Sequence, residues 1–247
     1  MLSLRHDDEL ARAGLGRPTA MIAGMVLAAG RSTRMGRLKP LLPWGQHTVI
    51  EQVVTTLLSA PLTDLLVVTG HEHDALAAVL QPYPLRIVFN PDYAAGEMVS
   101  SIQAGLRALG PTVEAVLLAV GDQPRMQAST VAAVIAAWRR GPPQRIVIPS
   151  YQMRRGHPIC LPRAVWPAVL ALGWQDSLRS LWQSLAGQIE HVTLDTPTIL
   201  SDMDTPEDYQ RELSAPSAIT PPASRFAGAE KIQREGEASA TDGYDLS

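Results

Sequence analysis

The chain has 247 residues and a formal net charge of −3, and 46% of its residues are hydrophobic against 18% charged. This composition excludes a chain that is disordered throughout, and it supplies enough apolar material for one large domain or two small ones. The slight negative charge argues against a nucleic-acid-binding protein, which would carry a surplus of Lys and Arg. No apolar run approaches the roughly 20 residues that span a bilayer, and the single cysteine, Cys160, fits a reducing compartment. We therefore expect a cytoplasmic protein with neither nucleic acid nor membrane among its partners.

The two ends of the chain differ from its middle. Residues 1–20 combine charge, Gly and Pro without a clear period and predict a flexible leader. Residues 214–247 are dominated by Pro, Ala, Ser, Gly and Glu. Such a segment cannot bury enough apolar area to offset the entropy of ordering it, so we expect a disordered tail. A single domain is then expected over residues 21–213.

Between these ends, short apolar segments alternate with longer helical patterns. The expected strands are rich in Val, Ile and Leu without polar alternation, and lie at 23–29, 65–69, 85–89, 113–120 and 145–149. The expected helices lie at 48–59, 74–80, 100–109, 128–140, 163–172 and 175–185. This alternation predicts right-handed crossovers and a three-layer α/β/α, Rossmann-like fold with a mostly parallel sheet. Ligands of such sheets bind beyond the carboxyl ends of the strands, so functional residues are expected in the segments that follow strands.

The first expected strand runs directly into a basic loop rich in small residues, LAAGRSTRMGRLK over residues 27–39. Its two glycines let the backbone approach a bulky ligand, and exposed N–H groups can then surround an anion. Four positive charges fall within nine residues: Arg31, Arg34, Arg37 and Lys39. The loop is therefore predicted to bind a polyphosphate, although it has neither the Walker A spacing nor the G-x-G-x-x-G dinucleotide fingerprint. The alternative is a solvated basic loop whose glycines serve only for turning.

Acidic residues gather in two later segments. Asp122 lies in Gly-Asp-Gln-Pro after the expected strand 113–120, a place suited to binding Mg²⁺, although Gly-Asp is also a common turn. In SDMDTPEDY, Thr205 before Pro206 predicts a helix N-cap with proline in the first turn. That prediction leaves Asp202 and Asp204 unexplained, and these two alternate on one side of an extended segment.

The loop LAAGRSTRMGRLK resembles the signature of nucleotidyltransferases that activate molybdopterin, sugar phosphates and similar substrates. With NPDY, GDQP, RGHP and DMDTPEDY, the resemblance extends from about residue 25 to residue 209 and is strongest to the molybdenum cofactor cytidylyltransferase family. It implies a Rossmann-like nucleotidyltransferase fold and Mg²⁺-dependent transfer of CMP from CTP to the terminal phosphate of molybdopterin, with release of pyrophosphate. Two alternatives stay open: another phosphorylated acceptor, such as a sugar or polyol phosphate, and a non-catalytic molybdopterin carrier for a partner oxidoreductase.

The same resemblance implies roles for individual residues. The implied nucleotide-binding residues are Leu27, Ala28, Ala29, Gly30, Arg31, Ser32, Met35, Gly36, Asn90, Ser100 and Ser101, with the stretch from Gly96 contributing to base and ribose contacts. The implied catalytic residues are Arg34, Lys39 and Asp122, and the implied metal ligands are Asp122 and Asp204, with Asp202 in support. The acceptor side would be lined by Arg155, Gly156 and His157. The implied partners are CTP, molybdopterin and a client molybdoenzyme.

Weaker predictions concern Ala29 and three histidines. The methyl group of Ala29, where guanylyltransferases tend to carry glycine, would narrow the base pocket and favour a pyrimidine. His71 and His73 lie two residues apart, and a solvated loop explains them better than a metal site. His157 fits a structural role as well as an acceptor contact.

Overall fold

The computed structural model describes residues 17, 19–94, 98–173, 176 and 178–215. Its strands in chain order are β1 (Ile22–Ala28), β2 (Pro43–Trp44), β3 (His47–Thr48), β4 (Asp64–Thr69), β5 (Arg86–Phe89), β6 (Ala115–Val120), β7 (Ile146–Tyr151), β8 (Arg154–Arg155), β9 (Ile159–Pro162) and β10 (Ile189–Thr193). Its α-helices are α2 (Val49–Leu58), α3 (His73–Leu80), α4 (Met98–Ala108), α5 (Ala128–Arg140), α6 (Trp166–Leu170), α7 (Leu178–Ser184) and α8 (Pro206–Ser214). Four 3-10 turns join them: η1 (Lys39–Leu41), η2 (Arg163–Val165), η3 (Ala186–Gln188) and η4 (Pro197–Leu200).

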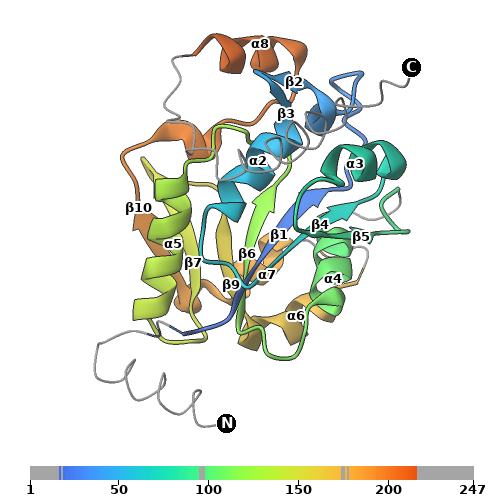
Figure 1. The fold of residues 1–247 in the computed structure, drawn as a ribbon. Coiled ribbons are helices and arrows are strands. Elements are labelled where there is room, and N and C mark those ends of the chain that lie inside the picture. The colour runs from blue at the N-terminus through green and yellow to red at the C-terminus, as the bar shows by residue number, and fades with distance from the viewer. Residues whose placement is uncertain (1–16, 18, 95–97, 174–175, 177, 216–247) are drawn as a thin grey trace, which may run out of the picture.

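A central sheet with the strand order β10-β7-β9-β6-β1-β4-β5 forms the middle layer (Figure 1). β1 pairs in parallel with β4 on one side and with β6 on the other. The chain therefore builds outward from β1 in one direction, through β4 and β5, and then returns to build in the other. Such a reversal leaves a crevice at the carboxyl ends of the two strands where it occurs, here β1 and β6.

Helices cover both faces of the sheet, and the side chains of β1 show why. Alternate residues of a strand point to opposite faces, and all seven residues of β1 are buried. One face of the sheet packs against α2, α3 and α5, and the other against α4, α6 and α7. The predicted three-layer α/β/α fold with a mostly parallel sheet is confirmed, and the five expected strands are present with small shifts at their ends.

The half of the sheet beyond β6, formed by β9, β7 and β10, departs from the predicted pattern. β9 lies between β6 and β7 and runs antiparallel to both, and the expected list of strands contained neither β9 nor β10. β9 has only four residues, and β10 contains the polar residues Glu190 and His191, so neither shows a long apolar segment of the kind used to identify the expected strands. The single helix expected at 163–172 is divided into η2 and α6, because Pro167 lacks an N–H group and occupies the first turn of a new helix.

Two described residues outside the expected domain range of 21–213, Arg17 and Ala215, contact residues within it. Most of the predicted leader and tail, residues 1–16, 18 and 216–247, lies outside the described residues. Arg17 is 1% exposed, and its guanidinium lies 3.9 Å from the ring centroid of Trp138. At the other end, Arg125 donates a hydrogen bond to the carbonyl oxygen of Ala215. Within the described ranges, no helix is both long and apolar enough to cross a membrane.

Candidate active site

The loops that follow β1 and β6 meet at the crevice between these two strands. The backbone N–H of Gly121 donates to the carbonyl oxygen of Leu27 over 2.9 Å, so the two strand ends touch directly. A Cβ atom at Gly121 would lie 3.1 Å from that oxygen and 3.2 Å from the Cβ of Ala28, closer than ordinary contacts allow. Glycine at this position lets Asp122 follow immediately beside the loop after β1.

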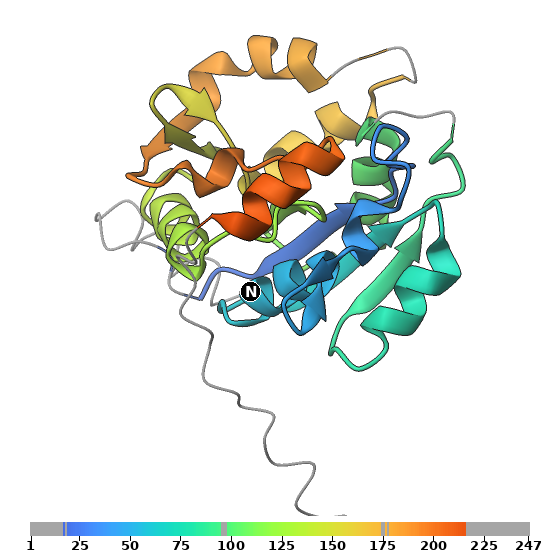
Figure 2. The ribbon, with the colours of Figure 1, turned by 90° about the horizontal axis from the view of Figure 1, so that it is seen from above.

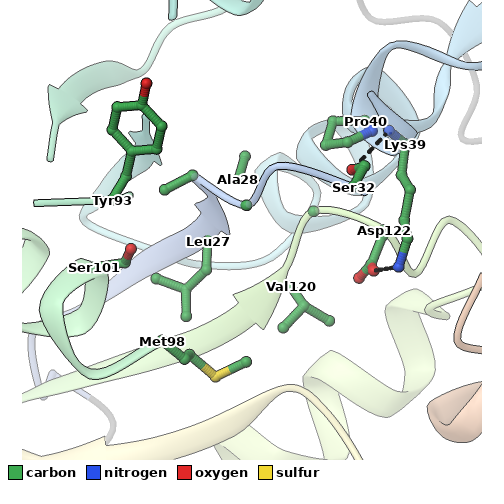
Figure 3. A pocket seen from close by; sticks show the side chains of 13 residues that line it. Leu27, Ala28, Ser32, Lys39, Pro40, Tyr93, Met98, Ser101, Val120 and Asp122 are labelled. Carbon is green, nitrogen blue, oxygen red and sulfur yellow. Dashed lines mark hydrogen bonds and ion pairs between the residues drawn. The ribbon is translucent and has the colours of Figure 1, made fainter. Parts of the chain in front are cut away.

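A pocket of about 290 Å³ opens at this point, close to the lower end of the range for small-molecule sites. It is lined by Leu27, Ala28, Ala29, Gly30, Ser32, Lys39, Pro40, Tyr93, Met98, Ser101, Val120, Gly121 and Asp122. Figure 3 shows that the lining has two chemically different ends. Tyr93, Met98 and Ser101 lie at one end, and the charged side chains of Lys39 and Asp122 lie at the other, with Leu27 and Ala28 between them. A ligand with one flat apolar part and one anionic part would match this division.

The charged end is organised around the ammonium group of Lys39. Its Nζ lies 2.6 Å from Oδ1 of Asp204 and 3.1 Å from Oδ2 of Asp122, and the lysine side chain is only 11% exposed. Burial by itself would lower the pKa of Lys39, but the hydrogen bond to Asp204 and the charge of Asp122 outweigh it, and the pKa is raised. The hydrogen bond from Lys39 lowers the pKa of Asp204, with a further contribution from Arg34. Both groups are therefore charged at neutral pH.

Local interactions hold these groups in place. The backbone N–H of Lys39 donates to Oγ of Ser32, which ties η1 to the basic loop. Arg34 contacts the second carboxylate oxygen of Asp204 over 2.8 Å, although the arginine side chain is 71% exposed. The predicted N-cap at Thr205 is confirmed, because its hydroxyl accepts a hydrogen bond from the backbone N–H of Asp208. Asp204 is thus fixed at the start of α8, which lies over the edge of the sheet where β1 ends in both Figures 1 and 2.

The acidic pair suits a hard divalent cation. Oxygens of Asp122 and Asp204 contact the same nitrogen atom, so the two carboxylates converge on one cation-sized position. Among the residues that the structure describes, no three His, Cys, Asp or Glu side chains gather into a complete metal centre. A pair of carboxylates that leaves the remaining ligands to phosphates and water is the arrangement Mg²⁺ prefers.

The other end of the pocket is built from the loop after β5 and the start of α4. Asn90 is 1% exposed, and its amide donates to the hydroxyls of Ser100 and Ser101, each over 3.0 Å. Asn90 therefore positions Ser101, which lines the pocket, and does not line it itself. Tyr93 packs against Gly70, where a Cβ atom would lie 2.4 Å from that of the tyrosine. The expected contacts of Gly96 lie outside the described residues.

Sequence reasoning missed several lining residues. Tyr93, Met98 and Val120 form much of the apolar wall. The signal for Tyr93 was its position three residues after Asn90 in the NPDY segment.

Five residues of the predicted nucleotide set do not line this pocket: Arg31, Met35, Gly36, Asn90 and Ser100. Met35 is 7% exposed and packs in a small apolar cluster with Leu42, Val49 and Met203. Arg31 and Gly36 line a second pocket of about 400 Å³, together with Arg37 and His71. Ser32 lines both pockets.

The expected acceptor residues lie at the end of β8 and in the loop between β8 and β9. Arg155 is exposed on β8. Gly156 packs so closely on Ile199 that a Cβ atom would lie 2.3 Å from its carbonyl oxygen. Burial lowers the pKa of His157, and the nearby charges of Asp202 and Asp122 only partly offset this effect. His157 is thus a neutral imidazole close to the acidic segments.

His71, His73 and Cys160 do not line the main pocket. His73 contacts the hydroxyl of Thr69 over 2.7 Å and packs against Phe89, whereas His71 packs near Tyr93. Each histidine thus has its own contacts. Cys160 is fully buried in β9, and burial raises the pKa of its thiol.

Comparisons with known proteins agree with this architecture. The model of the MobA-like NTP transferase domain matches residues 24–192. The nicotine blue oxidoreductase of Paenarthrobacter nicotinovorans is 31% identical over 201 residues, which cover 78% of this chain and 96% of that protein. The molybdenum cofactor cytidylyltransferase of Escherichia coli is 27% identical, over 75% of this chain and 92% of that protein.

A solved structure shows the same fold and a metal. Rv0371C of Mycobacterium tuberculosis in complex with manganese superimposes with a TM-score of 0.66 at 26% identity, covering 80% of this chain and 100% of that chain. The matched family is one of NTP transferases, so nucleoside triphosphates are its substrate class. The family match spans more than half of the sequence and includes the loop after β1, Lys39 and Asp122. The chain therefore belongs to the MobA-like NTP transferase family.

Proposed function

We propose that this protein is a metal-dependent cytidylyltransferase that transfers CMP from CTP to the terminal phosphate of molybdopterin or its molybdenum-bound form. The observation that carries the proposal is the convergence of Lys39, Asp122 and Asp204 at the charged end of a pocket whose other end is apolar. A nucleoside triphosphate has the same division between base and phosphates. The base and ribose would lie toward Tyr93 and Ser101, and the phosphates toward Lys39 and the loop 30–36.

The reaction needs no strong general base, because the acceptor phosphate is already an anion. One of its oxygens attacks the α-phosphorus, the bond from that phosphorus to the bridging oxygen breaks, and pyrophosphate leaves with the bonding electrons. Lys39 and Arg34 would neutralise charge on the phosphates and on the departing pyrophosphate. The loop after β1 would hold the triphosphate in line with the attacking oxygen.

A divalent metal, which we propose to be Mg²⁺ held by Asp122 and Asp204, would supply Lewis-acid stabilisation of charge at the phosphates. Lys39 contacts both carboxylates in the structure. Phosphate oxygens would therefore have to offer this ammonium group a competing partner when substrate binds. The geometry supports a metal site in which the substrate phosphates supply ligands in addition to Asp122 and Asp204.

The choice of CTP and molybdopterin rests on two observations. The relative from Escherichia coli is a molybdenum cofactor cytidylyltransferase that aligns with three quarters of this chain. Ala29 lines the pocket and is 5% exposed, so its methyl group limits the space available to a base. His157 and Arg155 would face the acceptor.

The alternatives to this function are transfer to another phosphorylated acceptor, a carrier role and an oxidoreductase activity. A sugar or polyol phosphate would require the same metal site with a different acceptor wall. A molybdopterin carrier would bind the acceptor without releasing pyrophosphate, and it would have no need for the acidic pair. The name of the relative from Paenarthrobacter nicotinovorans favours an oxidoreductase as a second candidate. The basic loop after β1 does not carry the dinucleotide fingerprint that would support nicotinamide binding.

The test is pyrophosphate release with Mg²⁺ and molybdopterin, comparing CTP, GTP, ATP and UTP, with and without chelator. We expect metal-dependent release with CTP. Release with a sugar or polyol phosphate but not with molybdopterin would contradict the proposed acceptor. If no nucleotide gives release, a molybdopterin titration and an assay for oxidation of reduced nicotinamide cofactors would identify a carrier or an oxidoreductase, and either result would overturn the proposal.

A further inference from the structure

One side-chain hydrogen bond joins the two segments that carry the acidic pair. Nε2 of Gln123 donates to Oδ1 of Asp202 over 2.6 Å, between residues 79 positions apart in the chain. Gln123 directly follows Asp122, and Asp202 precedes Asp204 by two residues. The bond therefore connects the same two segments that Lys39 links through Asp122 and Asp204.

Gln123 and Asp202 differ in how deeply their side chains are buried. Gln123 is 4% exposed, whereas Asp202 lies at the exposed surface. A buried amide that donates to a carboxylate makes a charge-assisted bond, which is stronger than one between neutral groups. Loss of the acceptor would leave the amide of Gln123 buried without this partner, and leaving a buried donor unsatisfied is costly.

The chemical type of residue 123 matters because of the charges around it. Lysine or arginine there would add a cation able to compete with Lys39 for Asp204. Glutamate would place a carboxylate against that of Asp202 and push the two segments apart. A neutral amide holds the segments together without changing the charge of the site.

The substrate-bound state makes this bond more important. In the structure, Lys39 offsets the mutual repulsion of Asp122 and Asp204 by contacting both. Phosphates that draw Lys39 away would leave the two carboxylates facing each other until a metal is bound. The bond between Gln123 and Asp202 contains neither Lys39 nor the acidic pair, so a shift of Lys39 toward phosphates does not itself break it.

Other contacts also anchor the segment of Asp202, among them those of Asp204 with Lys39 and Arg34. The backbone N–H of Asp202 donates to Leu200, Met203 is fully buried, and the N–H of Asp204 donates to Asp208 over 3.2 Å. These contacts fix the segment to η4, to the apolar cluster and to α8. The bond from Gln123 is a direct link from this segment to the loop of Asp122.

We propose that Gln123 is a positioning residue that sets the separation of Asp122 and Asp204 by holding Asp202 through a hydrogen bond. Asp202 then acts as the acceptor of that bond and not as a metal ligand. The inference rests on the proposed metal site, because the separation of the two carboxylates determines how well they bind one cation. Residues that orient the ligands of a metal contribute about 10- to 100-fold to its affinity.

The test exploits a pair of substitutions that reverse the bond while preserving its charge. Gln123→Glu alone places a second carboxylate against that of Asp202. Gln123→Glu combined with Asp202→Asn restores one donor and one acceptor, and the side-chain lengths are unchanged. Asp202→Asn alone keeps an oxygen that accepts from Gln123, and Asp202→Leu does not. Binding of Mn²⁺ to the full chain, in the presence of a non-hydrolysable CTP analogue, is followed by the loss of the electron paramagnetic resonance signal of free Mn²⁺. Thermal unfolding of each variant establishes that it is folded.

We expect Gln123→Glu and Asp202→Leu to weaken Mn²⁺ binding by about tenfold or more. The double variant should recover most of the affinity, and Asp202→Asn should keep it. If the double variant binds as weakly as Gln123→Glu, or if Asp202→Asn is as weak as Asp202→Leu, the positioning role is overturned. Unchanged affinity in all four variants would overturn that role alone, whereas a wild-type protein that binds no Mn²⁺ would overturn the metal site and this inference together.

Discussion

Different parts of the fold position the two carboxylates of the acidic pair, Asp122 and Asp204. Asp122 follows β6, a strand buried at the centre of the sheet and paired with β1 and β9. Asp204 comes from a segment between η4 and α8, beyond the residues 24–192 that match the family model. Backbone pairing places the first carboxylate, whereas side-chain contacts place the second. Changes to single side chains should therefore disturb Asp204 more easily than Asp122.

The contacts around Asp204 show how such a segment is fixed without a strand. Met203 inserts into the apolar cluster with Met35, Leu42 and Val49. The hydroxyl of Tyr209 donates to the carbonyl oxygen of Pro43, which ties α8 to β2. Together with the capping box of α8, these contacts hold the second carboxylate against Lys39.

Removal of either carboxylate tests whether both are needed for the chemistry. Asp122→Asn should lower kcat/KM for pyrophosphate release by about 1,000-fold, because it removes charge stabilisation at the reacting phosphates. Asp204→Asn should have a similar effect in spite of its different placement. Glu207→Gln, an exposed carboxylate-to-amide change in the same segment, is the matched control and should keep full activity. Activity in Asp204→Asn equal to that of the control would limit the site to Asp122.

Substitution of Lys39 separates its role toward the carboxylates from its role toward phosphates. Lys39→Met should lower kcat/KM by about 100-fold through lost charge neutralisation. It should also strengthen Mn²⁺ binding in the absence of nucleotide, because the ammonium group no longer contacts both carboxylates. Electron paramagnetic resonance titration measures this affinity. Weaker Mn²⁺ binding in Lys39→Met would mean that the lysine holds the pair in place and does not compete for it.

The helix cap beside Asp204 should matter for both stability and metal binding. Thr205→Ala removes the N-cap of α8, which contributes about 1 kcal/mol to stability, and should lower Tm by about 2–4 °C. It should also weaken Mn²⁺ binding, because the cap fixes the residue next to Asp204. Thr63→Ala is the control, since it removes a hydrogen bond to Ile22 at the amino end of β1, far from Asp204 in the fold. Equal Mn²⁺ affinities of the two variants would show that the cap stabilises α8 without positioning Asp204.

The smallest expected effect concerns the base. Ala29→Gly removes one methyl group from the pocket wall, and a group of that size gives discrimination of about 1–3 kcal/mol. The preference for CTP over GTP should fall by about tenfold in a competition assay, with kcat for CTP little changed. A preference that stays intact would exclude Ala29 as the source of base selectivity.

Local patterns in the sequence were sufficient for much of the fold. The five expected strands, the helix at 128–140 and the cap at Thr205 appear as predicted, because each depends on residues close together in the chain. The motifs also predicted a site at the edge of the sheet where β1 and β6 end, since segments after parallel strands meet there. Most of the loop residues expected to bind the nucleotide line the pocket.

Contacts between distant segments could not be predicted in the same way. The antiparallel insertion of β9 depends on which neighbours a four-residue strand finds, and its own sequence does not specify them. Met35 belongs to the signature loop, yet Met203 and Val49 draw it into an apolar cluster.

The sequence by itself determined the kinds of groups at the site: a basic loop after β1, an acidic residue after β6, and a second acidic segment before α8. Only the tertiary structure decided that Lys39 lies between two carboxylates, one of them 165 positions away, and that Gln123 links their backbones. The physical reason is that periodicity and capping act over a few residues. The distance between two charged side chains depends instead on the packing of the whole sheet and of the segments that close over its edge.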